Sequence, residues 1–109
     1  MAYDKHLADR VRAILEGRPA FGEKKMFGGV GFLLGGNMAC GILNEDLIVR
    51  VGPDNYEAAL QMRCTKPFDI TGRPMKGWVM VSAEGHKEKQ DLSAWVEQGA
   101  SFALTLPAK

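Results

Sequence analysis

The sequence predicts a two-layer α+β domain, in which three helices pack on one face of an antiparallel sheet. Near both ends of the chain, apolar residues recur at helical spacing. Between these segments, short apolar runs alternate with clusters of Gly, Asn and Asp, which is typical of antiparallel hairpins. The chain has 109 residues, of which 46% are hydrophobic, so it is long enough for one domain with a single core.

Residues 4–16 are predicted to form the first helix. Its apolar face consists of Leu7, Val11, Ile14 and Leu15. Asp4 suits the N-cap position, because its carboxylate can accept hydrogen bonds from the free N–H groups of the first turn. Gly17 and Pro19 are expected to end the helix, since glycine favours the C-terminal turn and proline disfavours helical backbone before it.

Three strands are predicted to follow as a meander, joined by turns at 35–37 and 44–46 that are rich in Gly, Asn and Asp. The predicted strands are residues 30–34, 38–43 and 47–51. A short fourth strand before Gly28 is an open alternative.

The second half of the chain is predicted to add one or two strands and two helices. It should contain a short helix that starts at Pro53 or Asp54 and ends near Met62, followed by an irregular segment at 63–77 with a brief edge strand at 68–70. A strand at 78–82, a polar turn at 83–88 and a last helix at 89–102 should complete the chain. Two prolines and two glycines within 63–77 argue against a long regular element there.

Charge argues against a dedicated nucleic-acid domain. Fourteen Lys and Arg residues stand against thirteen Asp and Glu, whereas such domains are usually strongly basic. Residues 63–76 are locally basic, and Phe68 and Trp78 beside them could stack on bases. The favoured interpretation is that both aromatic residues are core anchors, so direct nucleic-acid binding stays open.

No constellation for catalysis or metal binding is present in the sequence. Cys40 and Cys64 form no CxxC pair, and His6 and His86 belong to no zinc motif. We therefore expect no cofactor, no bound metal and no enzymatic activity. The N-terminus is polar and no apolar run reaches the roughly 18 residues of a membrane helix, so a cytoplasmic protein is expected.

The predicted strands are apolar or small on both faces. One face carries Leu33, Ala39, Leu43 and Ile48, yet the helices are expected to cover the opposite face. We expect these four residues to form an interface, covered by the 63–77 loop, by a partner protein or by a second copy in a homodimer.

Three motifs give the chain a resemblance to a known family. They are Met26-Phe27-Gly28-Gly29-Val30-Gly31-Phe32, Asp46-Leu47-Ile48-Val49-Arg50-Val51-Gly52 and Thr71-Gly72-Arg73-Pro74-Met75-Lys76-Gly77-Trp78. In this order they make the chain similar to the TfoX/Sxy N-terminal domain family over nearly its whole length. The resemblance implies a two-layer α+β fold and a link to competence regulation, in which full-length bacterial members act with the cyclic-AMP receptor protein. Those members carry a further C-terminal helical domain, which a chain ending at Lys109 would lack.

The resemblance supplies no catalytic residues, but it draws attention to two arginines among its recurring positions. The candidate binding residues are Arg50, Arg73, Lys76 and Lys25. We expect a non-enzymatic regulatory domain that acts through protein partners, with the transcription machinery as one class of partner. The alternatives are a small-anion or nucleic-acid binding module that uses Arg50, Arg73 and Lys76, and an enzyme of unknown reaction. Arg50 could instead pair with Asp69 and hold the loop to the sheet.

Overall fold

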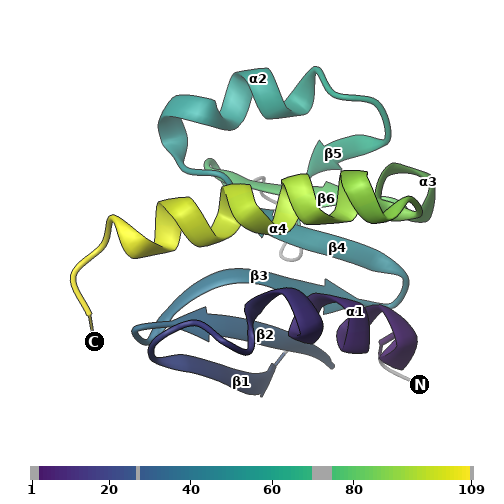
Figure 1. Ribbon diagram of the computed structural model, residues 1–109. Coiled ribbons are helices and arrows are strands. Elements are labelled where there is room, and N and C mark those ends of the chain that lie inside the picture. Colours follow the sequence, from purple (N-terminus) through teal and green to yellow (C-terminus); the bar gives the residue numbers. More distant parts are fainter. Residues whose placement is uncertain (1–2, 27, 70–74, 109) are drawn as a thin grey trace.

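The computed structural model describes residues 3–26, 28–69 and 75–108. These residues form a six-stranded antiparallel sheet in the order β1-β2-β3-β4-β6-β5, with the helices on one side (Figure 1). The elements are α1 (Lys5–Leu15), β1 (Phe21–Met26), β2 (Gly29–Leu34), β3 (Asn37–Leu43), β4 (Asp46–Arg50), the 3-10 turn η1 (Pro53–Asn55), α2 (Tyr56–Leu60), β5 (Thr65–Pro67), β6 (Trp78–Val81), α3 (Ala83–His86) and α4 (Lys89–Leu104). The predicted two-layer α+β architecture is confirmed.

The first helix forms as its sequence predicts. The Asp4 carboxylate accepts hydrogen bonds from the backbone N–H groups of His6 and Leu7, at 2.9 and 3.1 Å. Leu7, Val11 and Leu15 are fully buried, so the apolar face of α1 lies against the core.

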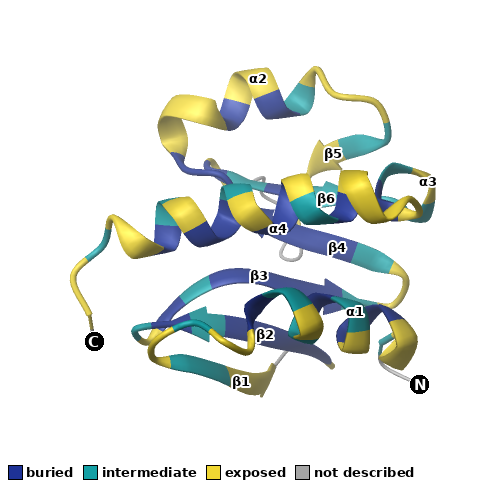
Figure 2. Ribbon diagram, in the orientation of Figure 1, coloured by how far each residue is buried: buried dark blue, intermediate teal, exposed yellow. Residues whose placement is uncertain are grey.

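The main core lies between the sheet and α4, the long helix that crosses it (Figure 2). The buried residues of α4 are Leu92, Trp95, Val96, Gly99, Ala100 and Ala103. Gly99 lets the helix approach closely, because a Cβ atom there would lie 2.3 Å from the carbonyl oxygen of Ala39 in β3. The helix continues two residues beyond its predicted end at residue 102.

The predicted meander is confirmed, and the alternative of a fourth strand is confirmed too. This strand, β1, pairs with β2 along its whole length. The two edge strands are poorly suited to pairing with another chain, since β1 carries three consecutive charges and β5 is short and ends in Pro67.

A β-bulge changes which side chains share a face of β3. Phe32 pairs with Cys40, whereas the next residue, Leu33, pairs with Met38, so Ala39 is the extra residue. Ala39 is fully buried in the core cluster, so the prediction that it belongs to an interface on the second face is wrong. Met38 takes its place beside Leu33, because the inserted residue reverses the alternation that the sequence predicts.

The second half departs from prediction in local detail. The edge strand is β5 at Thr65–Pro67 and not residues 68–70, of which residue 70 lies outside the described residues. The predicted helix at 54–62 is η1 followed by the short α2, and the predicted polar turn contains the one-turn helix α3. The last strand, β6, forms where it was predicted.

Candidate interaction site

On the face of the sheet opposite α1 and α4, hereafter the outer face, one row of paired residues runs across all six strands. In the order of the strands, the row is Lys24, Gly31, Gly41, Ile48, Met80 and Lys66. It points away from the main core, because Leu47 and Val49 on either side of Ile48 belong to the core cluster. We call these six residues the outer row.

The centre of the outer face is apolar. Leu33, Met38, Leu43 and Met80 are half-buried, while Ile48 is only 5% exposed. Met38 covers the neighbouring glycine, since a Cβ atom at Gly41 would lie 2.6 Å from its terminal methyl carbon. The predicted interface residues Leu33, Leu43 and Ile48 therefore lie on the same face of the sheet, where Leu33 and Leu43 are half-buried and Ile48 is buried.

The segment after β5 covers one end of this face. Phe68 is buried but lies outside the main core, and its ring centroid is 6.2 Å from that of Trp78. Trp78 is half-buried on β6 and also lies outside the core cluster. Phe68 and Trp78 thus pack against each other on the outer face; Phe68 is a buried anchor as the sequence predicts, whereas Trp78 is only half-buried.

Arg50 lies at the same end of the sheet, directly opposite Trp78 in the pairing of β4 with β6. Its guanidinium carbon is 5.1 Å from the centroid of the Trp78 ring and 5.4 Å from that of Phe102 on α4. Both distances are typical of cation–π contacts. Arg50 makes no ion pair with any residue that the structure describes, so the pairing with Asp69 is not observed.

Two glycines allow the side chains of Arg50, Trp78 and Phe102 to come together. Gly52 and Gly77 both have positive φ angles, of 87° and 95°, and the Gly77 carbonyl accepts hydrogen bonds from the N–H groups of Val51 and Gly52. A Cβ atom at Gly52 would lie 2.5 Å from the Phe102 ring. The end of β4 can therefore approach α4 closely enough for Phe102 to reach Arg50.

Lys76 is near the end of β4 that carries Arg50, because the adjacent Gly77 accepts hydrogen bonds from the N–H groups of Val51 and Gly52, whereas Lys25 is far from it. Lys76 is exposed next to Gly77 and lies two residues from Trp78. Lys25 is on β1, three strands away from β4, which is a separation of about 14 Å across the sheet. Arg73 lies outside the described residues.

The buried thiol and imidazole are poor candidates for catalysis. Cys40 is fully buried, and burial raises the pKa of its thiol from 9.0 to about 12, which disfavours the nucleophilic thiolate. The buried His86 places its Nε2 2.8 Å from the Glu45 carbonyl oxygen, and its Nδ1 has no partner among the described residues. Nowhere in the described residues do three His, Cys, Asp or Glu side chains gather as metal ligands.

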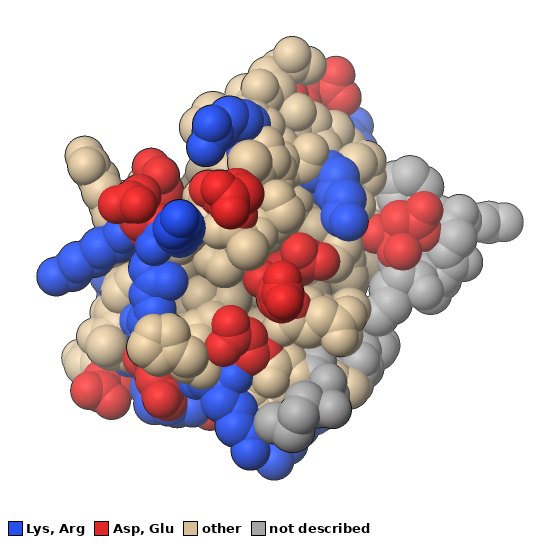
Figure 3. All heavy atoms as spheres, turned by 90° about the vertical axis from the view of Figure 1, so that its right-hand side faces the viewer, with Lys and Arg blue, Asp and Glu red and all other residues tan. Residues whose placement is uncertain are grey.

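Charges of both signs are mixed on the face near α3 and the turn between β3 and β4 (Figure 3). Two ion pairs join distant segments, Arg12 with Glu23 and Arg18 with Glu97. The hydrogen bonds that Arg12 donates to Glu23, and then to Asp9, raise the pKa of Arg12 above its usual value. Such exposed pairs contribute little to stability, and a mixed surface does not suit a nucleic-acid backbone.

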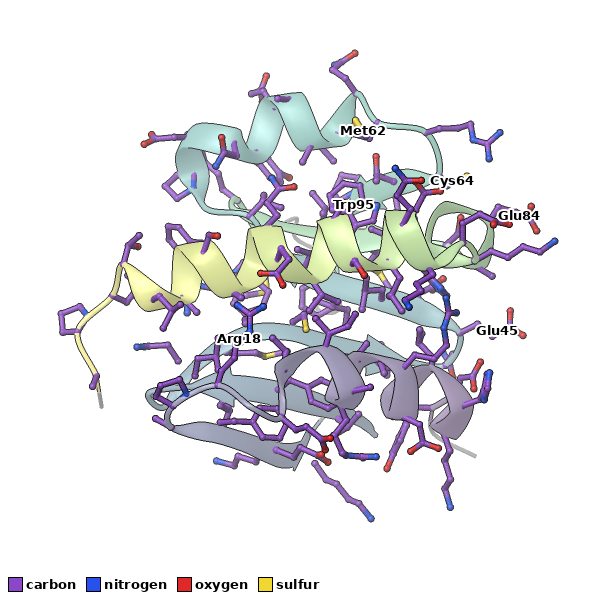
Figure 4. The ribbon with its side chains drawn as sticks, in the orientation of Figure 1. Arg18, Glu45, Met62, Cys64, Glu84 and Trp95 are labelled. Atoms are coloured by element: carbon purple, nitrogen blue, oxygen red, sulfur yellow. The ribbon has the colours of Figure 1, made fainter. Side chains whose placement is uncertain are left out.

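A groove of about 190 Å³ lies between α2 and α4, and no pattern in the sequence predicts it. Met62 lies over it with 57% of its surface exposed, and Trp95 lies below, as Figure 4 shows. Its full lining is Ala58, Ala59, Met62, Asp91, Ala94, Trp95 and Gln98. The groove is open because the alanines on the facing sides of α2 and α4 are too small to fill the space between the helices. Sequence patterns do not show that these two helices lie side by side.

Fold and surface together define a small α+β domain with one helix-covered sheet face and one apolar face that α1, α2 and α4 leave open. The family model of the TfoX N-terminal domain matches residues 13–103, and the chain belongs to this family. It is not a known enzyme family. Comparison with curated proteins and with solved structures gave no match. Among the residues described, no helix is long and apolar enough to cross a membrane.

Proposed function

We propose that this domain is a non-enzymatic interaction domain that binds a partner protein through the outer face of its sheet. The observation that carries the proposal is that the half-buried apolar residues Leu33, Met38 and Leu43 share the outer face, opposite α1 and α4. Isolated apolar residues are common on protein surfaces, but a contiguous apolar patch marks an interaction site.

The Arg50 end of the face gives the proposal further support. Trp and Arg are enriched among the residues that contribute most to binding at protein interfaces. Trp78 and Arg50 are both half-buried and lie beside the apolar surface. The contacts of Arg50 with Trp78 and Phe102 restrict its side chain, so less conformational entropy is lost when a partner binds.

We further propose a regulatory role, with a component of the bacterial transcription machinery as partner and competence as the process; this choice is made from the resemblance of the chain to TfoX/Sxy regulators.

Site-specific photo-crosslinking in cells tests the proposal. A photoreactive residue in place of Leu43, on the outer face, should give a defined protein adduct that mass spectrometry identifies. The same residue in place of Ser101, an exposed position on α4, is the control and should give none. Adducts from Ser101 alone, or from neither position, would contradict the outer face as the binding surface.

A further inference from the structure

We infer that the groove between α2 and α4 binds a basic side chain, Lys or Arg, of a partner protein. The groove lies on the helix side of the domain and not on the outer face, so this site goes beyond the proposed function and does not rest on it. Three properties of the groove support a basic side chain: its size, its apolar lining and the charges of the two helices.

The groove has the size of one side chain. Its volume is about 190 Å³. Pockets for drug-sized ligands measure roughly 300–1,000 Å³, whereas an engineered cavity of about 150 Å³ takes a single benzene molecule. A whole helix, about 10–12 Å across, is also too large for it. One side chain that projects from a partner therefore fits the groove best.

The lining of the groove is mostly apolar. Ala58 and Ala59 of α2 and Ala94 of α4 leave it open, and Met62 and Trp95 lie on its two sides (Figure 4). Lys and Arg bury their methylene stems against such surfaces while they keep the charged head group in water. The groove is therefore suited to the stem of a basic side chain.

The charges of the two helices favour a positive head group at the rim. Asp91 lines the groove, and it makes no ion pair with any residue that the structure describes. On the opposite side, η1 and α2 contain Asp54 and Glu57 and no basic residue. Lys89 is the one basic residue of α4, but residues two apart do not face the same side of a helix. The rim is thus complementary to a cation.

Two basic residues near the ends of the helices do not neutralise this rim. Arg63 leads from α2 towards α3, since its carbonyl oxygen would lie 3.5 Å from a Cβ atom at Gly85. Lys87 lies beside α1, because its carbonyl accepts a hydrogen bond from Arg10. Neither Arg63 nor Lys87 pairs with Asp91. A Lys or Arg of a partner can therefore form a charge-assisted hydrogen bond with this carboxylate.

Other side chains suit the groove less well. A Leu or Phe side chain would fill the apolar part but would take water from the Asp91 carboxylate and the Gln98 amide without giving them a partner. An acidic side chain would meet the like charges of Asp91 and Glu57. A basic side chain satisfies the apolar lining and the acidic rim together.

Photo-crosslinking in cells tests the inference. A photoreactive residue in place of Met62 should give an adduct with a partner protein, and the crosslinked peptide should carry Lys or Arg close to the attachment point. Asp91→Lys should lower the yield of this adduct several-fold, because the rim then repels the head group. Ala94→Leu should lower it too, because the added side chain fills the groove, and Ala94 is exposed enough to accept it.

A matched control separates the groove from general charge effects. Glu16→Lys makes the same change of net charge at an exposed position at the end of α1, and it should leave the yield unchanged. Circular dichroism and thermal melting of the three variants confirm that they fold. No adduct, an adduct with a second copy of this chain, crosslinked peptides without basic residues, or equal effects of Asp91→Lys and Glu16→Lys would each overturn the inference.

A small probe tests the chemistry in the purified domain. n-Butylguanidinium has the stem and head group of an Arg side chain, and in NMR titrations it should shift the methyl signals of Ala58 and Ala94 and the indole signal of Trp95, but not that of Trp78. Pentanoate has a similar length and the opposite charge, and it should bind at least several-fold more weakly. Asp91→Asn should remove most of this difference. Equal shifts with both probes would contradict the acidic rim.

The outcomes distinguish the groove from the outer face. If a photoreactive residue at Leu43 gives a protein adduct and one at Met62 gives none, the outer face binds protein and the inference about the groove fails. If the Met62 position gives the expected adduct and the Leu43 position gives none, the groove binds a basic side chain and the proposed function of the outer face fails.

Discussion

Replacing Gly99 with alanine tests the closest approach between the helix layer and the sheet. Gly99 lies in the second half of α4, and the added Cβ atom would be 2.3 Å from the Ala39 carbonyl oxygen and 3.1 Å from its carbon. These atoms are backbone of β3, which pairs on both sides, so they cannot move without disturbing the sheet. The helix must instead move outward by several tenths of an ångström, which loosens its contacts with β3 and β4.

Two opposing effects decide the magnitude. Alanine is a better helix former than glycine, and this alone would stabilise the protein by about 1 kcal/mol. Overpacking of a tight contact costs about 1–3 kcal/mol, and an overlap with rigid backbone belongs at the upper end of this range. We therefore expect Gly99→Ala to lower the free energy of unfolding by about 2 kcal/mol, which corresponds to a fall in Tm of roughly 8 °C.

Urea unfolding followed by the fluorescence of Trp78 and Trp95 measures the effect, which should appear as a lower midpoint at an unchanged slope. Gly22→Ala is the matched control, since among the described residues nothing lies within 4 Å of the added Cβ atom. It should leave the midpoint nearly unchanged. If Gly99→Ala were as stable as the wild type or more stable, helix propensity would be the larger effect, and α4 could not lie as close to β3 as described.

The remaining predictions concern a helix cap, the Arg50 contacts and the buried thiol. Asp4→Ala should destabilise the protein by about 1 kcal/mol in urea titration, because two N–H groups of α1 lose their acceptor, and Asp4→Ser should restore most of the loss. A double-mutant cycle of Arg50→Gln and Phe102→Leu should show a coupling energy of about 0.5–1 kcal/mol, and additive effects would mean that the two side chains do not interact. In the native protein, Cys64 should react with a thiol reagent and Cys40 only after unfolding, and equal rates would contradict the burial of Cys40. Burial raises the pKa of the Cys40 thiol from 9.0 to about 12, so between these pH values the unfolded chain loses the thiol proton while the folded chain keeps it. The free energy of unfolding should therefore fall as pH rises from 9 towards 12. Cys40→Ala should remove the part of this fall that is due to the thiol.

Local signals in the sequence predict most of the fold correctly. The cap and apolar face of α1, the hairpins of the meander and the long α4 each depend on residues that are neighbours in the chain. The bulge at Ala39 has no such signal, because strict alternation fits the residues from Met38 to Leu43 equally well. One inserted residue moves Ala39 into the core and Met38 to the outer face. The prediction of the strand itself is therefore correct, but the predicted faces of these two residues are wrong.

The candidate site depends still more on tertiary structure. Leu33, Leu43 and Ile48 could be nominated from sequence because alternation within single strands places them on one face. The contact of Arg50 with Phe102 joins residues from β4 and α4, which no local pattern connects. The outer row requires the register of all six strands, including β6 between β4 and β5, against the order of the chain. Lys24 and Lys66 are 42 residues apart in the sequence, and only this strand order places them at the two ends of the outer row.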